Sequence, residues 1–240
     1  MKIKHILKSF IPEIVRNPIY LYESSLKKEV KNAIGSFSIT SNDKWLDVGC
    51  GLRPYEQHFP IGSYVGVDVE TSGRDHSLKA PDYFYDGRIL PFESKSFDGV
   101  ISTQVLEHVP NPSALLAEIN RIVKPNGGLI LSVPFAWQEH EAPFDFSRFS
   151  SFGLVFLLKE AGFETKQITK DIGSIESIAI LLNVYIINNL IPKGFGSLVV
   201  VLLCFPIQAI ARFAQLLLPD EGKFYLNLTI CAKKYKDINL

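Results

Sequence analysis

The feature that most restricts the fold of this chain is the alternation of short apolar runs with helical patterns between residues 44 and 170. The runs are rich in valine, isoleucine and aromatic residues and are bounded by turn residues, as buried strands are. They cover residues 44–49, 64–69, 82–86, 97–102, 128–135 and 163–170. Strands that alternate with helices, here at 111–128 and 149–164, predict an α/β fold whose parallel sheet is covered on both faces.

The length and composition fit this fold and exclude some partners. A chain of 240 residues suits one domain with an insertion, and we expect the main domain to comprise 36–170 and 224–235, including an alternating strand at 224–234. Lysine plus arginine equal aspartate plus glutamate at 25 each, so no global positive field would attract nucleic acid. Three widely spaced cysteines form neither a disulfide framework nor a metal pattern, which suits a cytoplasmic location.

The first 35 residues form a predicted N-terminal segment. Apolar residues recur at steps of three and four from Ile3 to Val15, and lysines occupy the other face, which indicates an amphipathic helix. Two interpretations stay open. The helix packs on the domain, or it lies on an anionic lipid surface and makes a peripheral membrane contact at the inner face of the membrane.

Residues 171–223 form a predicted apolar helical insertion, because a connection of this length is structured in its own right. A bilayer-spanning helix needs about 20 consecutive apolar residues. In the second apolar block, Gln208, Arg212 and Gln215 interrupt the run and share one helix face, which favours amphipathic helices. A lid, a homodimer interface and a lipid-contacting surface are the alternatives for this insertion.

The turn after the first strand points to a ligand. Gly49 and Gly51 let the backbone approach a bound molecule closely. Asp47 stands two residues earlier, where it would repel a pyrophosphate but suits a ligand with a positive amino group. This acid, together with Pro54 in place of the third fingerprint glycine, argues against a nicotinamide-dependent oxidoreductase.

Two further carboxylates follow the next two strands. Asp68 ends the second strand, where an acid accepts hydrogen bonds from both hydroxyls of a ribose, and Asp86 ends the third, where it can accept a bond from an exocyclic amine. A ribose, an amine-bearing base and a cationic tail together describe S-adenosylmethionine. The alternative is that each aspartate caps a turn or helix.

These residues resemble those of the class I S-adenosylmethionine-dependent methyltransferases. The similarity lies in "LDVGCG", "VGVDV", "LPFESKSFD", "VLEHVPNP" and "RIVKPNGGLILSVPF". It implies a Rossmann-like, seven-stranded, mostly parallel sheet with the last strand antiparallel. It also implies roles for cofactor-binding residues: Asp47, Gly49, Cys50 and Gly51 at the methionine part, Asp68 at the ribose, Asp86 and Gly87 at the adenine, and Gln104 near the methyl sulfonium.

One position departs from this family. Arg53 stands where many members have a third glycine, and a cation close to a sulfonium is unfavourable unless its side chain points away. The departure leaves the path of the loop open.

The acceptor is expected beside residues 134–150, which follow the fifth strand. His140 is the first candidate for a general base, oriented by Asp145 or Glu141. The predicted acceptor contacts are Glu141, Arg148 and Trp137, and Arg148 could bind a carboxylate or phosphate on the acceptor. His108, nearer the methionine end, is an alternative base or a structural residue. His140 and Arg148 could instead simply tie the loop to the domain. We expect no metal, because no second histidine follows His140 at ligand spacing.

The function expected from these observations is methyl transfer from S-adenosylmethionine to a small molecule, a glycan or a lipid-linked acceptor. The stretch "HEAPFDFSRF" resembles methyltransferases encoded beside surface-polysaccharide genes, which adds a glycan or lipid-linked sugar to the acceptors implied. The alternative is a non-catalytic, membrane-associated binding module with the same fold.

Overall fold

The computed structural model describes residues 17–70, 77–191 and 197–238, with the backbone alone for 197–201. The amphipathic pattern from Ile3 to Val15 therefore lies outside the described residues.

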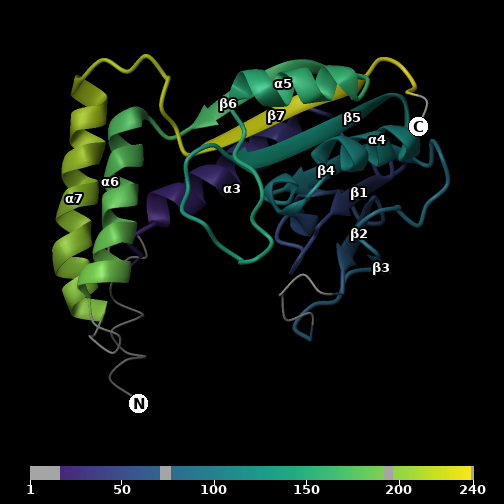
Figure 1. Cartoon of the computed structure of the whole chain (residues 1–240). Coiled ribbons are helices and arrows are strands. Elements are labelled where there is room, and N and C mark those ends of the chain that lie inside the picture. The colour runs from purple at the N-terminus through teal and green to yellow at the C-terminus, as the bar shows by residue number, and fades with distance from the viewer. Residues whose placement is uncertain (1–16, 71–76, 192–196, 239–240) are drawn as a thin grey trace. The chain divides into compact units, whose positions relative to one another are not determined.

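A seven-stranded sheet forms the centre of the larger part of the chain (Figure 1). Its order is β3-β2-β1-β4-β5-β7-β6, and β7 runs antiparallel to β5, which confirms the predicted fold and the reversed last strand. The strands are β1 (Trp45–Val48), β2 (Tyr64–Val69), β3 (Tyr83–Tyr85), β4 (Phe97–Thr103), β5 (Val123–Pro134), β6 (Phe163–Asp171) and β7 (Asn227–Lys234).

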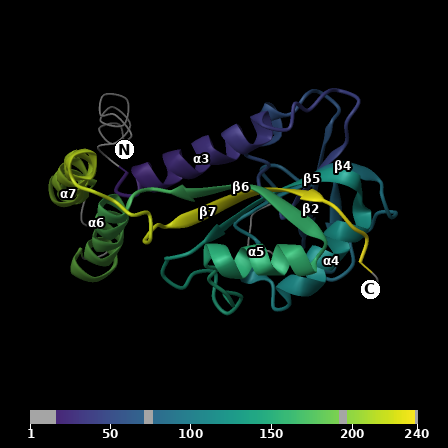
Figure 2. The same ribbon diagram turned by 90° about the horizontal axis from the view of Figure 1, so that it is seen from above.

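Helices cover both faces of this sheet (Figure 2). On one face lie α4 (Pro112–Ile122) and α5 (Ser151–Glu160), and on the other lies the second half of α3 (Tyr20–Gly35). The side chains of Asn111 and Ser150 begin α4 and α5 by accepting hydrogen bonds from backbone N–H groups at 3.2 Å. Two single turns of 3-10 helix, η1 (Glu56–His58) and η2 (Leu106–His108), follow β1 and β4.

The structure moves the boundaries of three predicted elements by a few residues. The helix expected at 111–128 ends at Ile122, because Val123 already pairs with Phe97 in the sheet. Gly128 then pairs with Gly99, so 124–127 bulge out of the strand. A buried β-branched residue such as Val123 gains more in the sheet than at the end of a helix. The helix expected at 149–164 likewise shortens to α5, and the strand expected at 224–234 begins at Asn227.

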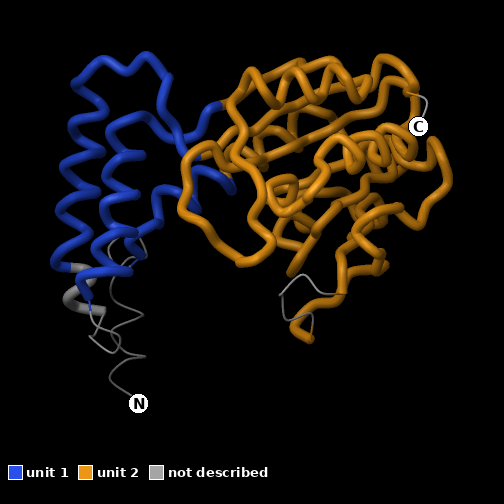
Figure 3. The backbone as a smooth tube through the Cα atoms, viewed as in Figure 1, with its two compact units in different colours: residues 1–27, 170–226 blue, residues 28–169, 227–240 orange. Residues whose placement is uncertain are grey.

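The chain divides into two compact units (Figure 3). Residues 28–169 and 227–240 form the unit that holds most of the sheet, and residues 1–27 and 170–226 form the other. In the second unit, α6 (Ser174–Tyr185) runs into a π-helical turn, η3 (Ile186–Leu190), and is followed by α7 (Ser197–Leu217). No helix within the described residues is long and apolar enough to cross a membrane.

Polar contacts join α6 to α7. Asn183 of α6 is buried and donates to the carbonyl of Cys204 on α7 at 3.3 Å. Arg212 of α7 forms an ion pair with Glu176 of α6 at 2.8 Å, and the Gln215 side chain accepts from the backbone N–H of Ile175 at 3.0 Å. Arg212 and Gln215 of α7 thus face α6 and share one helix face, as their spacing predicts.

Candidate active site

Three carboxylates stand on adjacent strands at one edge of the sheet. Asp47 of β1 is paired with Gly66 of β2, and Asp68 of β2 is paired with Phe84 of β3. Asp86 follows the end of β3 directly. Because β3, β2 and β1 are neighbours and parallel, their carboxyl ends meet at one edge, next to the point where the strand order reverses between β1 and β4. Ligands bind at such switch points in open α/β sheets.

Asp47 is a buried acid whose hydrogen bonding is incomplete. Its residue is 1% exposed, and its Oδ2 atom accepts a hydrogen bond of 2.6 Å from the Tyr64 hydroxyl. Its Oδ1 atom has no hydrogen-bond partner among the described residues. Burial, with a smaller contribution from Asp68, raises the pKa of Asp47 to about 7. A buried carboxylate oxygen without a donor is costly, so this atom suits a cationic ligand.

The loop after β1 takes the backbone form that its glycines allow. Gly49 has φ +73° and Gly51 has φ +50°. A Cβ atom at Gly49 would lie 2.4 Å from Cγ2 of Val105, so no larger residue fits there without movement. The Gly51 N–H donates to Asp68 Oδ2 at 2.9 Å, which ties the loop to the second carboxylate.

The structure shows how Arg53 can replace the third glycine of the family pattern. It has φ +56°, so it takes the left-handed conformation that a glycine would take. Its guanidinium donates to Glu56 at 2.9 Å and to Asp82 at 3.0 Å. The cation is therefore neutralised by two carboxylates other than those of the trio.

Cys50 lies between the two glycines and is buried. Burial, followed by the nearby charge of Asp47, raises the pKa of its thiol far above the usual range. A Cβ atom at Gly66 would lie 2.9 Å from its sulfur, so the side chain packs against β2. A cofactor contact by Cys50 remains a prediction, and the burial of its side chain leaves its backbone for that contact.

Asp86 and Gly87 form an exposed turn at the end of β3. Asp86 Oδ1 accepts from the backbone N–H groups of Arg88 at 2.8 Å and Ile89 at 3.0 Å, which lowers its pKa. This is the turn-capping role that the sequence left open as an alternative. Both bonds use the same oxygen, and a carboxylate has several acceptor positions, so the cap is compatible with a ligand at the other oxygen.

Gln104 marks the end of β4. It has φ +55°, which is uncommon for a residue other than glycine. Its backbone N–H donates to the Ser132 carbonyl at 2.8 Å, and its side-chain amide donates to the Ser132 hydroxyl at 3.2 Å. This strained backbone, held from β5, directly follows β4, the strand that pairs with β1.

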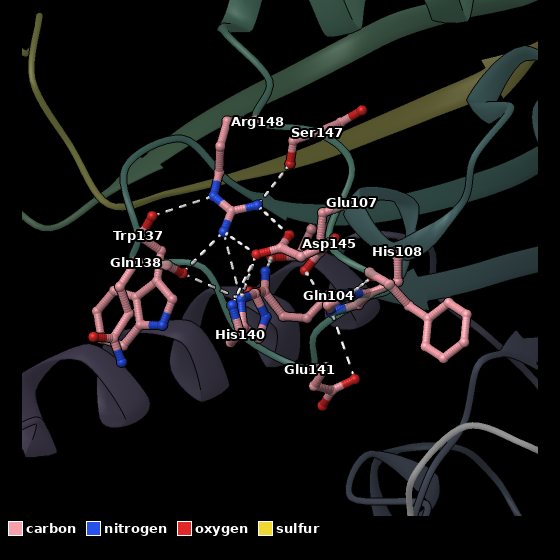
Figure 4. A network of polar contacts seen from close by, with 12 residues as sticks. Gln104, Glu107, His108, Trp137, Gln138, His140, Glu141, Asp145, Ser147 and Arg148 are labelled. Atoms are coloured by element: carbon pink, nitrogen blue, oxygen red, sulfur yellow. Dashed lines mark hydrogen bonds and ion pairs between the residues drawn. The ribbon is translucent and has the colours of Figure 1, made fainter.

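Arg148 anchors the loop after β5 (Figure 4). Its guanidinium binds both carboxylate oxygens of Asp145, at 2.6 and 2.7 Å, and donates to the carbonyls of Trp137, Gln138 and Ser147. The pair strongly lowers the pKa of Asp145, mainly through the Arg148 hydrogen bonds. These contacts favour a structural role for Arg148, one of the two that the sequence allowed. Trp137 takes part through its carbonyl.

Two predicted base candidates come together in space. The rings of His108 and His140 meet edge to face with centroids 4.7 Å apart. His140 Nδ1 lies 3.2 Å from Asp145 Oδ2, so Asp145 orients it as expected. Glu141 instead faces His108, with Oε2 3.8 Å from Nε2.

Glu107 is a residue of this cluster that the sequence reasoning missed. Its side chain is completely buried, and neither carboxylate oxygen has a hydrogen-bond partner among the described residues. Burial raises its pKa to about 8, with nearby acids adding to the effect. The signal available in the sequence is an acid that directly follows the apolar run Val105-Leu106.

Comparison with known proteins identifies the family. A family profile described as a methyltransferase domain matches residues 22–168, more than half of the chain. The chain belongs to the class I S-adenosylmethionine-dependent methyltransferases. S-adenosylmethionine is the cofactor of this family, as the sequence predicted.

Three relatives show the extent of the similarity. The chain is 36% identical over 100 residues to phthiotriol/phenolphthiotriol dimycocerosates methyltransferase 1 of Mycobacterium ulcerans, covering 38% of this chain and 37% of that protein. It is 33% identical over 100 residues to the ubiquinone biosynthesis O-methyltransferase of Photobacterium profundum, covering 37% and 43%. A putative S-adenosylmethionine-dependent methyltransferase from Listeria monocytogenes has the same fold, with a TM-score of 0.53, 13% identity and coverage of 89% and 100%. The chain spans less than half the length of both curated relatives.

Proposed function

We propose that this chain transfers a methyl group from S-adenosylmethionine to a hydroxyl oxygen of a small-molecule or lipid-linked acceptor. The observation that carries the cofactor part is the buried Oδ1 atom of Asp47, which has no partner among the described residues. An ammonium group placed there would satisfy it.

The proposed cofactor residues divide by the part of the molecule they would hold. Asp47 would bind the α-amino group, and the open turn at Gly49 and Gly51 would pass close to the methionine part. Asp68 would accept from the ribose hydroxyls and Asp86 from the adenine amine. Arg53 fits this arrangement because its charge is already taken up by Glu56 and Asp82.

On the acceptor side, the loop after β5 supplies the base. The bound cofactor offers an electrophilic methyl group on a sulfonium, and the enzyme must position an acceptor oxygen in line with it. That oxygen also has to lose its proton. In a site without a bound metal ion, His140, oriented by Asp145, is the base we propose, and Arg148 is a positioning residue that holds Asp145.

The α6–α7 hairpin supports an acceptor or surface of lipid character. Its polar residues Asn183 and Glu176 are buried and bonded to the partner helix, while many of its apolar side chains are exposed. The exposed set is Ile178, Leu182, Tyr185, Leu202, Leu203, Ile210, Phe213, Leu216 and Leu217. A hairpin with polar groups between the helices and apolar groups outside is suited to lipid contact. Of the relatives, one is named for dimycocerosates and one for ubiquinone, which agrees with an apolar acceptor.

The cofactor proposal is tested by calorimetry with S-adenosylmethionine. We expect micromolar binding, weakened by Asp68→Ala by roughly 1–3 kcal/mol as hydrogen bonds to the ribose are lost. Asp98→Ala, at the amino end of β4 and so at the opposite edge of the sheet, is the matched control and should leave the affinity unchanged. Equal affinity in the Asp68 variant would remove this residue from the site.

The acceptor class is tested by label transfer and by flotation. Methyl-tritiated cofactor incubated with cell extracts should yield label in the lipid-extractable fraction. The protein should also float with vesicles that contain anionic lipid. Phe213→Ser with Leu216→Ser should abolish flotation, while the control pair Phe152→Ser with Phe156→Ser, exposed on α5, should not. Protein that stays in the soluble fraction with every lipid tested would rule out the lipid-contacting hairpin.

A further inference from the structure

Glu107, His108 and His140 form a cluster of metal-binding side chains at the acceptor side of the site. Glu107 and His108 belong to η2 after β4, and His140 lies in the loop after β5. One ligand atom from each lies within 4.8 Å of the others. Figure 4 shows His108, His140 and Glu107 close together, and the two imidazoles meet edge to face.

The proton on His108 is fixed by its surroundings. Its Nδ1 atom lies 2.6 Å from the carbonyl oxygen of Phe144, which can only accept, so Nδ1 carries the proton. In the neutral ring Nε2 then presents a lone pair. This atom faces two carboxylates, with Glu107 Oε1 at 3.9 Å and Glu141 Oε2 at 3.8 Å. In their ionised forms both carboxyl groups only accept hydrogen bonds, as does the Nε2 lone pair, so a cation placed between them would satisfy all three.

The separations favour a metal ion over a proton. A proton shared between nitrogen and carboxylate would draw them to about 2.7–2.9 Å. The observed gaps of 3.8 and 3.9 Å are too long for that bond. Two ligands at the tetrahedral angle on one Zn²⁺ ion, each at about 2.0–2.2 Å, lie about 3.3–3.6 Å apart. The observed gaps therefore require only small side-chain movements to close on an ion.

The Nδ1 atom of His140, like that of His108, lies next to hydrogen-bond acceptors. Its Nδ1 atom lies 3.2 Å from Asp145 Oδ2 and 3.3 Å from the Gln138 carbonyl oxygen. Nη2 of Arg148 lies 3.4 Å from this nitrogen but already donates to both of these acceptors, so a proton on Nδ1 is favoured. Histidine ligands of metals almost always donate their other N–H to a carboxylate or a carbonyl, as both rings do here.

The buried carboxylate of Glu107 also points to a bound cation. It is completely buried, and neither of its carboxylate oxygens has a hydrogen-bond partner among the described residues. Its backbone carbonyl accepts from the N–H groups of Phe146 at 2.8 Å and Ser147 at 3.2 Å. The loop that carries His140 is thus fastened directly to η2, which holds the three side chains in one place.

We propose that Glu107, His108 and His140 bind one divalent transition-metal ion of the Zn²⁺ type. Two imidazoles and one carboxylate are a ligand set of catalytic zinc sites, which keep another position open. This inference rests on the proposed methyl transfer. The open position would take the acceptor hydroxyl and lower its pKa, so that its proton passes to solvent. The new oxygen–carbon bond then forms as the sulfur–carbon bond breaks, and His140 acts as a ligand in place of a base.

The test is metal binding to the full chain after removal of metals with a chelator. Titration with CoCl₂ should give the visible d–d bands of a low-symmetry site at one equivalent, and ZnCl₂ should displace them. Glu107→Gln, His108→Gln and His140→Gln should each weaken cobalt binding at least tenfold. His58→Ala, a histidine outside the cluster, is the matched control and should bind cobalt like the parent protein.

Two further measurements keep the result interpretable. Thermal unfolding of each variant shows that it is folded, and calorimetry with S-adenosylmethionine is run on the same metal-free samples. Cofactor binding without a cobalt site would overturn the metal inference and leave the proposed function standing. Cobalt bands that persist in all three cluster variants would overturn it as well. A cobalt site that needs the cluster, in a protein that binds no S-adenosylmethionine, would overturn the proposed function alone.

Discussion

Binding of S-adenosylmethionine should release a proton from Asp47. The carboxyl group is buried and its pKa is raised to about 7, so it is half protonated at neutral pH in the cofactor-free protein. An ammonium group bound at Oδ1 favours the ionised form and pulls this pKa down. The proton must leave as the cofactor binds, and the affinity must therefore fall as the pH falls.

The size of the expected fall in cofactor affinity follows from the raised pKa of Asp47. The apparent dissociation constant is multiplied by one plus the ratio of protonated to ionised Asp47. With a pKa of about 7, this factor is about 2 at pH 7.0 and about 11 at pH 6.0, so affinity should drop about fivefold. A free α-amino group has a pKa near 7.7–8.0, so the cofactor itself stays largely charged over this range. Tyr64 and Cys50, which face Asp47, have pKa values raised far above it.

Calorimetry at pH 6.0 and 7.0, in two buffers of different ionisation enthalpy, measures both affinity and proton release. Asp47→Asn keeps an acceptor for Tyr64 but cannot titrate, so its weaker binding should not change between these pH values. The raised pKa also means that the cofactor-free fold loses stability as pH rises from about 4 to 7. At pH 8, Asp47→Asn should therefore have an unfolding free energy up to about 4 kcal/mol larger than that of the parent, and a higher melting temperature. Affinity that is the same at both pH values in the parent would refute this reasoning.

Other parts of the site lead to three further predictions. Gly49→Ala should lower the melting temperature and weaken cofactor binding more than tenfold, since its Cβ would lie 2.4 Å from Val105 Cγ2; adding Val105→Ala should restore part of both, and no recovery would contradict the steric explanation. Arg148→Lys should lose the two-pronged bond to Asp145 and about 2–3 kcal/mol of unfolding free energy in urea, whereas a purely acceptor-binding role would leave stability unchanged. The Cys50 thiol should resist iodoacetamide in the native protein at pH 8 and react once the chain is unfolded, followed by peptide mass analysis.

The strands were predictable because each is a short, buried, apolar run with clear turn residues. The same logic located Asp47 and Asp68, since an acid inside such a run stands out. The end of α4 was less predictable, because Val123 pairs with Phe97 from another part of the chain, and no local pattern records that pairing.

The acceptor side shows the same limit more strongly. His108 and His140 are far apart in the sequence, and spacing rules search for a second histidine nearby on one element. Contacts between distant segments bring the two rings together: Phe146 and Ser147 donate to the Glu107 carbonyl, and His108 Nδ1 meets the Phe144 carbonyl. The proposed role of Glu107 as a ligand depends on its complete burial, and the position of one acid in a short motif does not reveal burial. Interactions between distant segments decide this part of the molecule.

The α6–α7 hairpin lies between β6 and β7 in the chain, and the two ends of this segment are close together. The backbone N–H of Leu226 donates to the carbonyl of Asp171 at 3.4 Å, so the two ends of the excursion touch. In an ancestor or a designed variant, a tight turn at this junction could take the place of the whole excursion without displacing β6 or β7. Evolution could therefore exchange the hairpin, for which we propose contact with apolar material, while the residues at the carboxyl ends of β1 to β4 stay as they are.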